Sequence, residues 1–124
     1  MSQDVVADAI NQIMNAKKSR KSELKIKRHS KLLLSVLAIA KLNGYVKNYK
    51  AEGNELKIEL GKVNGCRAIK PRTPVQVDEI EKYIKRYLPA KNIGIIILST
   101  SEGLMTHNRA IENKIGGSLL AYFY

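Results

Sequence analysis

The stretch that decides the fold is residues 93–103, which read IGIIILSTSEG. Its first part, 93–98, is a continuous apolar run, and a run of this length is typical of a strand buried in the middle of a sheet. Its second part, 99–103, is polar and ends in glycine, so we expect a loop there. Because the loop directly follows a buried strand, its backbone should be held firmly. The sequence therefore predicts a rigid sheet that presents a polar loop.

The polar loop carries chemistry that suits RNA. Ser99, Thr100 and Ser101 each have a hydroxyl that can donate and accept a hydrogen bond. Gly103 permits a positive φ or the close approach of a ligand. Hydroxyls and backbone amides suit base edges, ribose 2′-hydroxyls and phosphate oxygens. A serine-rich turn that caps the next helix would explain the same residues, and the sequence favours neither interpretation.

The rest of residues 65–124 is predicted to form a C-terminal subdomain around this strand. Its expected elements are a strand at 66–70, a helix at 78–88, the strand at 93–98, a short helix near 107–113 and a strand at 118–124. Pro71 and Pro74 should stop the first of these strands. The pair Gly116-Gly117 should form a turn that brings the last strand close to the polar loop.

Residues 1–64 are predicted to form an N-terminal subdomain. Its expected elements are a helix at 4–16, a strand at 23–28, a helix at 31–43 and two strands at 45–50 and 55–60. Ser30 is a good N-cap for the second helix and Gly44 a good C′ residue. That helix is apolar on nearly every side, which indicates burial against the sheet. We therefore predict an α+β chain of two small subdomains that share an interface, αβαββ at 1–64 and βαβ plus a short helix and terminal strand at 65–124.

The chain has a large excess of positive charge. Its 124 residues include 22 Lys and Arg against 11 Asp and Glu, a net charge of +11, whereas small domains commonly need only about 2–8. The densest segment, 17–31, has eight basic residues and Glu23 as its single acid. Such a surface gains free energy by releasing counterions from a nucleic acid. We therefore expect a polyanionic partner; solubility is the plain alternative.

The start of the second helix is another candidate binding site. Ser30 and Lys31 combine a helix N-terminus, a capping hydroxyl and a cation, and this combination suits a phosphate group. The basic run just before them, ending in Lys27 and Arg28, favours a phosphate contact over a plain N-cap beside a solvated lysine.

Several other classes of protein find little support in the sequence. No apolar run reaches the ~18 residues of a membrane span, and the first eight residues do not resemble a signal peptide. The lone Cys66 excludes an internal disulfide and a cysteine-based zinc site, and we expect no cofactor. Two alternatives stay open: a small hydrolase that uses Glu102 and His107 as an acid–base pair, although no nucleophile motif supports it, and a non-specific nucleic-acid packaging protein.

The segment 99–106, Ser-Thr-Ser-Glu-Gly-Leu-Met-Thr, followed by Gly116-Gly117 and an apolar last strand, resembles the signature of the small-subunit ribosomal protein S-eight family. The residues Ser30-Lys31 and Gly44-Tyr45-Val46 are also similar to that family. Lys70-Pro71-Arg72 and the ending Leu-Leu-Ala-Tyr-Phe-Tyr resemble its archaeal and eukaryotic-type branch. The resemblance covers essentially the whole chain.

The resemblance implies a non-enzymatic primary RNA-binding protein of the small ribosomal subunit. Such a protein binds a helix in the central domain of small-subunit rRNA, nucleates assembly and touches neighbouring small-subunit proteins. It is cytoplasmic, on the ribosome, is not bound to a membrane, and is expected to be a monomer when free. The C-terminal subdomain would hold irregular bases with its Ser-Thr-Ser-x-Gly loop, while the N-terminal subdomain contacts the backbone. The expected RNA contacts are Ser30, Lys31, Ser99, Thr100, Ser101, Gly103, Met105, Thr106, Gly116, Gly117, Asn11, Asn15, Lys27 and Arg28.

Overall fold

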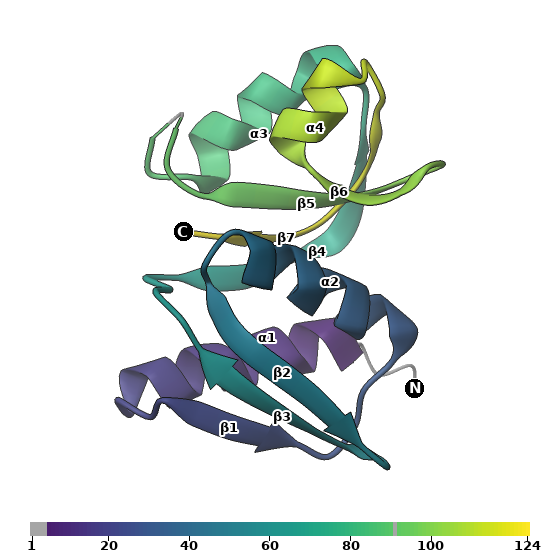
Figure 1. Cartoon of the computed structure of the whole chain (residues 1–124). Coiled ribbons are helices and arrows are strands. Elements are labelled where there is room, and N and C mark those ends of the chain that lie inside the picture. Colours follow the sequence, from purple (N-terminus) through teal and green to yellow (C-terminus); the bar gives the residue numbers. More distant parts are fainter. Residues whose placement is uncertain (1–4, 91) are drawn as a thin grey trace. The chain divides into compact units, whose positions relative to one another are not determined.

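The structure is a computed structural model that describes residues 5–90 and 92–124. The chain divides into two compact units, an N-terminal unit, Met1–Arg67, and a C-terminal unit, Ala68–Tyr124. Each unit has its own antiparallel sheet with helices, as Figure 1 shows. The predicted α+β class with two small subdomains is confirmed.

The N-terminal unit has the predicted αβαββ order. Its elements are α1 (Val5–Lys18), β1 (Glu23–Ile26), α2 (Lys31–Leu42), β2 (Val46–Glu52) and β3 (Glu55–Leu60). The strands lie in the order β1-β3-β2, so β1 is an edge strand. The first residue of the predicted helix, Asp4, lies outside the described residues.

Alternating side chains explain how the N-terminal unit packs. Leu56 and Ile58 of β3 are fully buried, whereas Lys57 between them is exposed. Both helices pack on the sheet, with α1 against β1 and α2 against β2. In α1, the apolar residues that recur every three to four positions are the buried ones, and the polar residues between them stay exposed. This is the expected pattern of an amphipathic helix on a sheet.

As predicted, α2 is buried against the sheet, but the last residue of the helix is exposed. Leu33, Val36, Leu37 and Ala40 form the buried stripe. Leu42 is 86% exposed, because at 100° per residue it points to the side of the helix opposite this stripe. The helix is therefore covered on one face only, although its sequence is apolar on both.

The C-terminal unit contains a four-stranded sheet. The elements from the unit boundary onward are β4 (Cys66–Val75), a 3₁₀ turn η1 (Val77–Glu79), α3 (Ile80–Tyr87), β5 (Ile95–Thr100), β6 (Gly103–Thr106), α4 (His107–Glu112) and β7 (Gly117–Phe123). The strand order is β4-β7-β5-β6, so β5 is central, as predicted. Residues of α3 and α4 pack against β5 and β7 in one apolar cluster that includes Ile80, Ile84, Ala110, Ile96, Leu98 and Leu119.

The prediction that Pro71 and Pro74 stop β4 is wrong. The strand continues to Val75. Since β4 lies at the edge of the sheet with β7 as its one neighbour, a proline, which lacks an N–H, can sit where no ladder hydrogen bond is needed. The edge position of β4 is a property of the assembled sheet that local sequence does not reveal.

Candidate nucleic-acid interface

The polar segment 99–103 is the tip of a β-hairpin rather than a loop. Ser99 and Thr100 are the last residues of β5, and Gly103 is the first of β6. Thr100 pairs with Gly103 across a two-residue turn formed by Ser101 and Glu102. The loop prediction is therefore wrong for Ser99, Thr100 and Gly103, and β6 was not predicted. The residues of β6 pair with the end of β5, at Ser99 and Thr100. This pairing fixes the backbone of the segment more firmly than a loop would.

Thr100 holds the turn together. Its hydroxyl donates a hydrogen bond to the carbonyl oxygen of Gly103 at 2.7 Å and accepts one from the backbone N–H of Glu102 at 3.1 Å. Gly103 has a φ of +107°, a conformation that favours glycine. The Ser101 hydroxyl is exposed and pairs with no group among residues 5–90 and 92–124. One hydroxyl thus shapes the turn, and another is presented to solvent.

The predicted turn at Gly116-Gly117 is wrong, because Gly117 is the first residue of β7, and it is Gly117 that contacts the hairpin. Ser118 of β7 pairs with Ser99 of β5, which confirms that the last strand passes close to the Ser99 segment. A Cβ atom on Gly117 would collide with the carbonyl oxygen of Ser99 and lie 2.9 Å from Cγ2 of Thr100. Glycine is therefore required at 117 by contact with the hairpin, not by its own φ.

Met105 and Thr106 have internal roles. Met105 is 7% exposed and belongs to the apolar cluster of the C-terminal unit. Thr106 is the N-cap of α4, and its hydroxyl accepts a hydrogen bond from the Arg109 N–H at 3.4 Å. Because Thr106 performs the capping, the hydroxyls of Ser99–Ser101 are not needed for it. This decides against the serine-rich helix cap left open by the sequence.

The proposed acid–base pair of a hydrolase does not form a usable site. His107 is 1% exposed, and its Nδ1 accepts a hydrogen bond from the backbone N–H of Ile96 at 3.1 Å. Burial lowers the pKa of His107 below its usual 6.5, which favours the neutral ring. Glu102 lies in the exposed hairpin turn. His107 therefore links α4 to β5 as a structural residue.

The start of α2 has the predicted geometry. The Ser30 hydroxyl accepts a hydrogen bond from the Leu33 N–H at 3.2 Å and so caps the helix. Lys31 is exposed in the first turn. Nearby, Nε2 of His29 lies 2.9 Å from the carbonyl oxygen of Gly53, which ties this segment to the β2–β3 turn. The ammonium group of Lys31 therefore lies at the N-terminus of α2, where backbone N–H groups and the helix dipole favour an anion.

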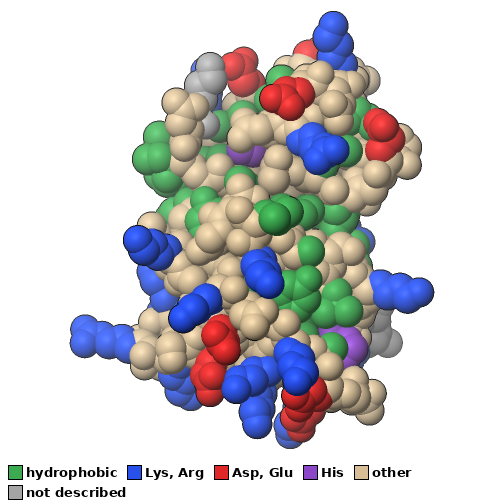
Figure 2. Space-filling model, in the orientation of Figure 1, with side chains coloured by type: hydrophobic (Ala, Val, Ile, Leu, Met, Phe, Trp, Pro, Cys, Tyr) green, Lys and Arg blue, Asp and Glu red, His purple; other side chains and the backbone are tan. Residues whose placement is uncertain are grey.

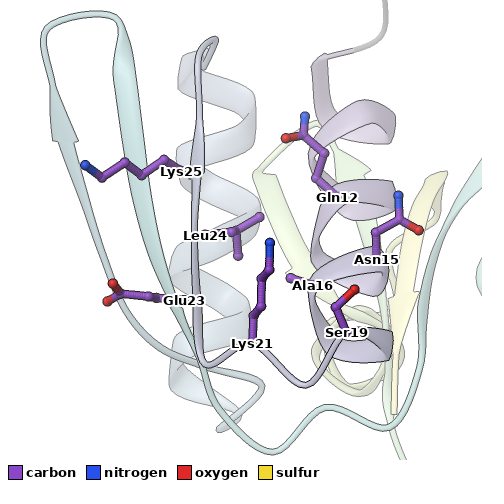
Figure 3. A pocket seen from close by; sticks show the side chains of 8 residues that line it. All are labelled: Gln12, Asn15, Ala16, Ser19, Lys21, Glu23, Leu24 and Lys25. Atoms are coloured by element: carbon purple, nitrogen blue, oxygen red, sulfur yellow. The ribbon is translucent and has the colours of Figure 1, made fainter.

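A polar groove runs between α1 and β1. One part of it, about 510 Å³, is lined by Gln12, Asn15, Ala16, Ser19, Lys21, Glu23, Leu24 and Lys25. Figure 3 shows Gln12 and Asn15 on α1, with Ser19 and Lys21 on the connection to β1. A separate, smaller pocket of about 80 Å³ is lined by Val5, Asp8, Gln12, Ile26, Lys27 and Arg28. The structure therefore places Asn15 in one pocket and Lys27 and Arg28 in another, and Asn11 is exposed and lines neither.

Gln12, Lys21 and Lys25 are groove residues that were not among the predicted contacts. The signal that could have found them is periodicity. Gln12 lies three residues before Asn15 on the polar face of α1. On the face shown in Figure 2, Lys and Arg side chains gather over the N-terminal unit, with some acidic side chains among them. Residues 1–64 account for 13 basic and 6 acidic residues, a net charge of +7.

Comparison with known proteins identifies the family. The family model described as Ribosomal protein S8 matches residues 4–124. The chain belongs to this family. It is 44% identical to the small ribosomal subunit protein uS8 of Nanoarchaeum equitans, over 100% of both chains. It is 44% identical to the uS8 protein of Methanoregula boonei, over 98% of this chain and 97% of the relative, and 42% identical to that of Methanosphaerula palustris, over 98% of each.

Membership of the ribosomal protein S8 family confirms the resemblance seen in the sequence, including its archaeal character. The family consists of small-subunit ribosomal proteins, which form a structural class rather than an enzyme class, so RNA binding and a part in translation follow from it. No helix within residues 5–90 and 92–124 has the length and apolar character needed to cross a membrane.

Proposed function

We propose that this protein is a primary binder of small-subunit rRNA, that it recognises a helix in the central domain, and that its binding nucleates assembly of that region. The observation that carries the proposal is the Ser99–Gly103 hairpin tip, which is braced by two neighbouring strands and leaves the Ser101 hydroxyl free. A pre-positioned hydroxyl loses little conformational entropy on binding. It therefore suits discrimination among RNA shapes.

The hairpin is proposed to read the irregular part of the RNA helix. Sequence-specific RNA recognition acts mainly on unstacked bases and on ribose 2′-hydroxyls, which a wide, shallow minor groove exposes. Ser101 can donate to or accept from such groups, and the backbone at Gly103 has no side chain to keep RNA away. Because Gly117 is in close contact with Ser99 and Thr100, the hairpin tip cannot shift toward β7 without moving that strand.

The N-terminal unit is proposed to supply backbone contacts. Ser30 and Lys31 offer a capped helix N-terminus to a phosphate. The groove between α1 and β1 adds the amide of Asn15, and the smaller pocket at the end of β1 adds the cations of Lys27 and Arg28. Phosphate contacts fix position and orientation but carry no sequence information. The two units would thus divide affinity and specificity between them.

The remaining parts of the proposal follow from the family. The protein would act in the cytoplasm as part of the ribosome, with neighbouring small-subunit proteins as further partners, and would be a monomer before assembly. Neither a cofactor nor a catalytic step is needed for recognition of this kind.

The proposal is tested by sequencing the RNA that copurifies with the protein at about physiological salt. Enrichment of one segment in the central domain of small-subunit rRNA is expected. If about four to six phosphates are contacted, log K should fall with log salt with a slope of about −3 to −6. Recovery of RNA without regard to sequence or structure would reject the recognition of a defined helix and favour non-specific packaging.

A further inference from the structure

A basic hollow lies at the start of β1, at the opposite end of the strand from Ser30 and Lys31. It has a volume of about 520 Å³ and is formed by the end of α1, the connection to β1 and the segment after β3. Its lining residues are Lys17, Arg20, Lys21, Ser22, Leu60, Gly61, Lys62, Val63 and Asn64. Four of these nine are cationic and none is acidic. The hollow therefore has the charge of an anion site.

The walls of this hollow are fixed. Nζ of Lys17 donates a hydrogen bond to the carbonyl oxygen of Asn64 at 2.8 Å, which joins the end of α1 to the segment after β3. The backbone N–H groups of Gly61 and Lys62 each donate at 3.0 Å to the carbonyl oxygens of Tyr45 and Gly44. These hydrogen bonds fix the backbone segments that line the hollow.

The cations of Arg20, Lys21 and Lys62 are uncompensated. All three side chains are exposed, and none forms an ion pair with an acid within the described part of the chain. Lysines on the outer face of the same sheet differ, because Lys50 lies 3.4 Å from Glu52 and Lys57 lies 3.5 Å from Glu23. The positive charge of the hollow is thus available to a ligand, whereas Lys50 and Lys57 are each paired with an acid.

Arg20 occupies a backbone position that suits glycine. Its φ is +58°. Its N–H donates to the carbonyl oxygen of Lys17, and the N–H of Lys21 donates to that of Ala16, both at 2.9 Å. These bonds form the common helix ending in which the left-handed residue is usually glycine. Arginine is less favourable than glycine in this conformation, and Arg20 lines the hollow.

We propose that this hollow is a phosphate-binding site that holds one phosphate group of the RNA backbone. The guanidinium of Arg20 can bind it in a bidentate manner, while Lys21 and Lys62 add charge and the Ser22 hydroxyl can donate. The four residues of β1 alone separate this site from Lys31 by about 13 Å, so the two sites contact different phosphates. The inference rests on the proposed function only in taking RNA as the source of the phosphate.

The test uses Arg20→Gly and Lys62→Ala in the full chain, with two RNAs, the rRNA helix recovered by copurification and a plain duplex of equal length. Each variant should weaken the binding of both RNAs alike, by about fivefold, and reduce the salt slope by about one. Lys85→Gln, an exposed lysine of α3 outside every proposed contact, is the matched control for charge. Its affinity and salt slope should stay close to those of the unchanged protein.

Arg20→Gly also separates binding from folding. It should raise the melting temperature by a few degrees, because glycine relieves the left-handed strain. Lys114→Gly is the control, since Lys114 has a φ of +54° at the corresponding position after α4. The two variants should gain stability equally.

The phosphate site is overturned if Arg20→Gly and Lys62→Ala have the same affinities and salt slopes as Lys85→Gln. That result would leave the proposed function intact. Weakened binding of the rRNA helix alone would also overturn the phosphate site, because a phosphate contact cannot distinguish the two RNAs. If the unchanged protein shows no preference for the rRNA helix, the proposed function fails. The phosphate site is still supported if Arg20→Gly then weakens duplex binding.

Discussion

The hairpin tip of the C-terminal unit and the basic ends of the N-terminal unit are proposed to bind RNA by opposite means. The tip has no cation; strand pairing, the Thr100 hydroxyl and the close contact of Gly117 fix its backbone, and the Ser101 hydroxyl is exposed. The N-terminal unit presents long, exposed cations around α1, β1 and the start of α2. Fixed hydroxyls discriminate between RNA structures, whereas mobile cations attract any phosphate backbone. The difference shows how one small chain can gain affinity from one unit and specificity from the other.

The largest expected effect comes from removing the support behind the hairpin. Gly117→Val should lower the free energy of unfolding by about 3 kcal/mol, because its side chain would collide with the carbonyl oxygen of Ser99 and with Thr100. Denaturant unfolding measures this loss. Ser118→Ala, at the next position of β7, is the control and should cost far less. A Gly117→Val protein as stable as that control would show that the contact does not position the hairpin.

The next largest effect concerns the two hydrogen bonds of the Thr100 hydroxyl, which hold the hairpin turn together. Thr100→Val keeps the shape of the side chain but removes both hydrogen bonds of the hydroxyl, and should lower the free energy of unfolding by about 1–2 kcal/mol. The preference for the rRNA helix over a plain duplex should fall as well, since the tip loses its fixed shape. Lowered stability with an unchanged preference would mean that the shape of the turn does not matter for recognition.

Lys31→Ala tests the proposed phosphate contacts of the N-terminal unit. It should weaken the binding of every RNA by about 1 kcal/mol and leave the preference among RNAs unchanged, because a phosphate contact carries no sequence information. Ser30→Ala is the companion variant. It removes the helix cap and should lower stability by about 1 kcal/mol, which Lys31→Ala should not do. A change in preference on Lys31→Ala would assign this lysine to the reading of bases.

The smallest expected effect is a pH dependence of the C-terminal unit. The folded pKa of His107 is lowered from 6.5 by burial, so the unfolded chain binds a proton more readily than the folded one. The contribution of His107 is complete above about pH 6.5 and is lost as the pH falls towards the lowered pKa. His107→Asn should flatten the dependence of stability on pH over this range. Parallel curves for His107→Asn and the unchanged protein would contradict this account.

Local patterns were sufficient where a residue's role depends on its neighbours in sequence. The stripe of α1, the Ser30 cap and the central position of the apolar strand follow from spacing and composition. β6 was missed because its four residues are few and directly follow a polar turn, so they carry little periodic signal. The run of β4 past Pro74 was missed because its cause is an edge position that exists only in the assembled sheet.

The candidate site likewise contains residues that local sequence could identify and residues that only the tertiary structure brings together. Sequence alone pointed to Ser99–Gly103 and to Ser30-Lys31, but could not tell that Thr100 clamps the turn while Ser101 is free. It placed Met105 among the contacts, whereas the alternation along β6 turns that side chain into the core. Lys62 could not be linked to Arg20, because 42 positions separate them and only the tertiary fold, which joins the end of α1 to the segment after β3, brings them to one hollow.

The most direct test of the division of labour is Ser101→Ala, with stability and the affinity ratio between the rRNA helix and a plain duplex measured on the same protein. The free energy of unfolding should stay within about 0.5 kcal/mol of its original value, because the hydroxyl makes no bond within residues 5–90 and 92–124. The preference for the rRNA helix should fall by about 1–3 kcal/mol, since RNA groups would stay desolvated without a partner. An unchanged ratio would contradict the account, and lowered stability with that ratio would make Ser101 a structural residue.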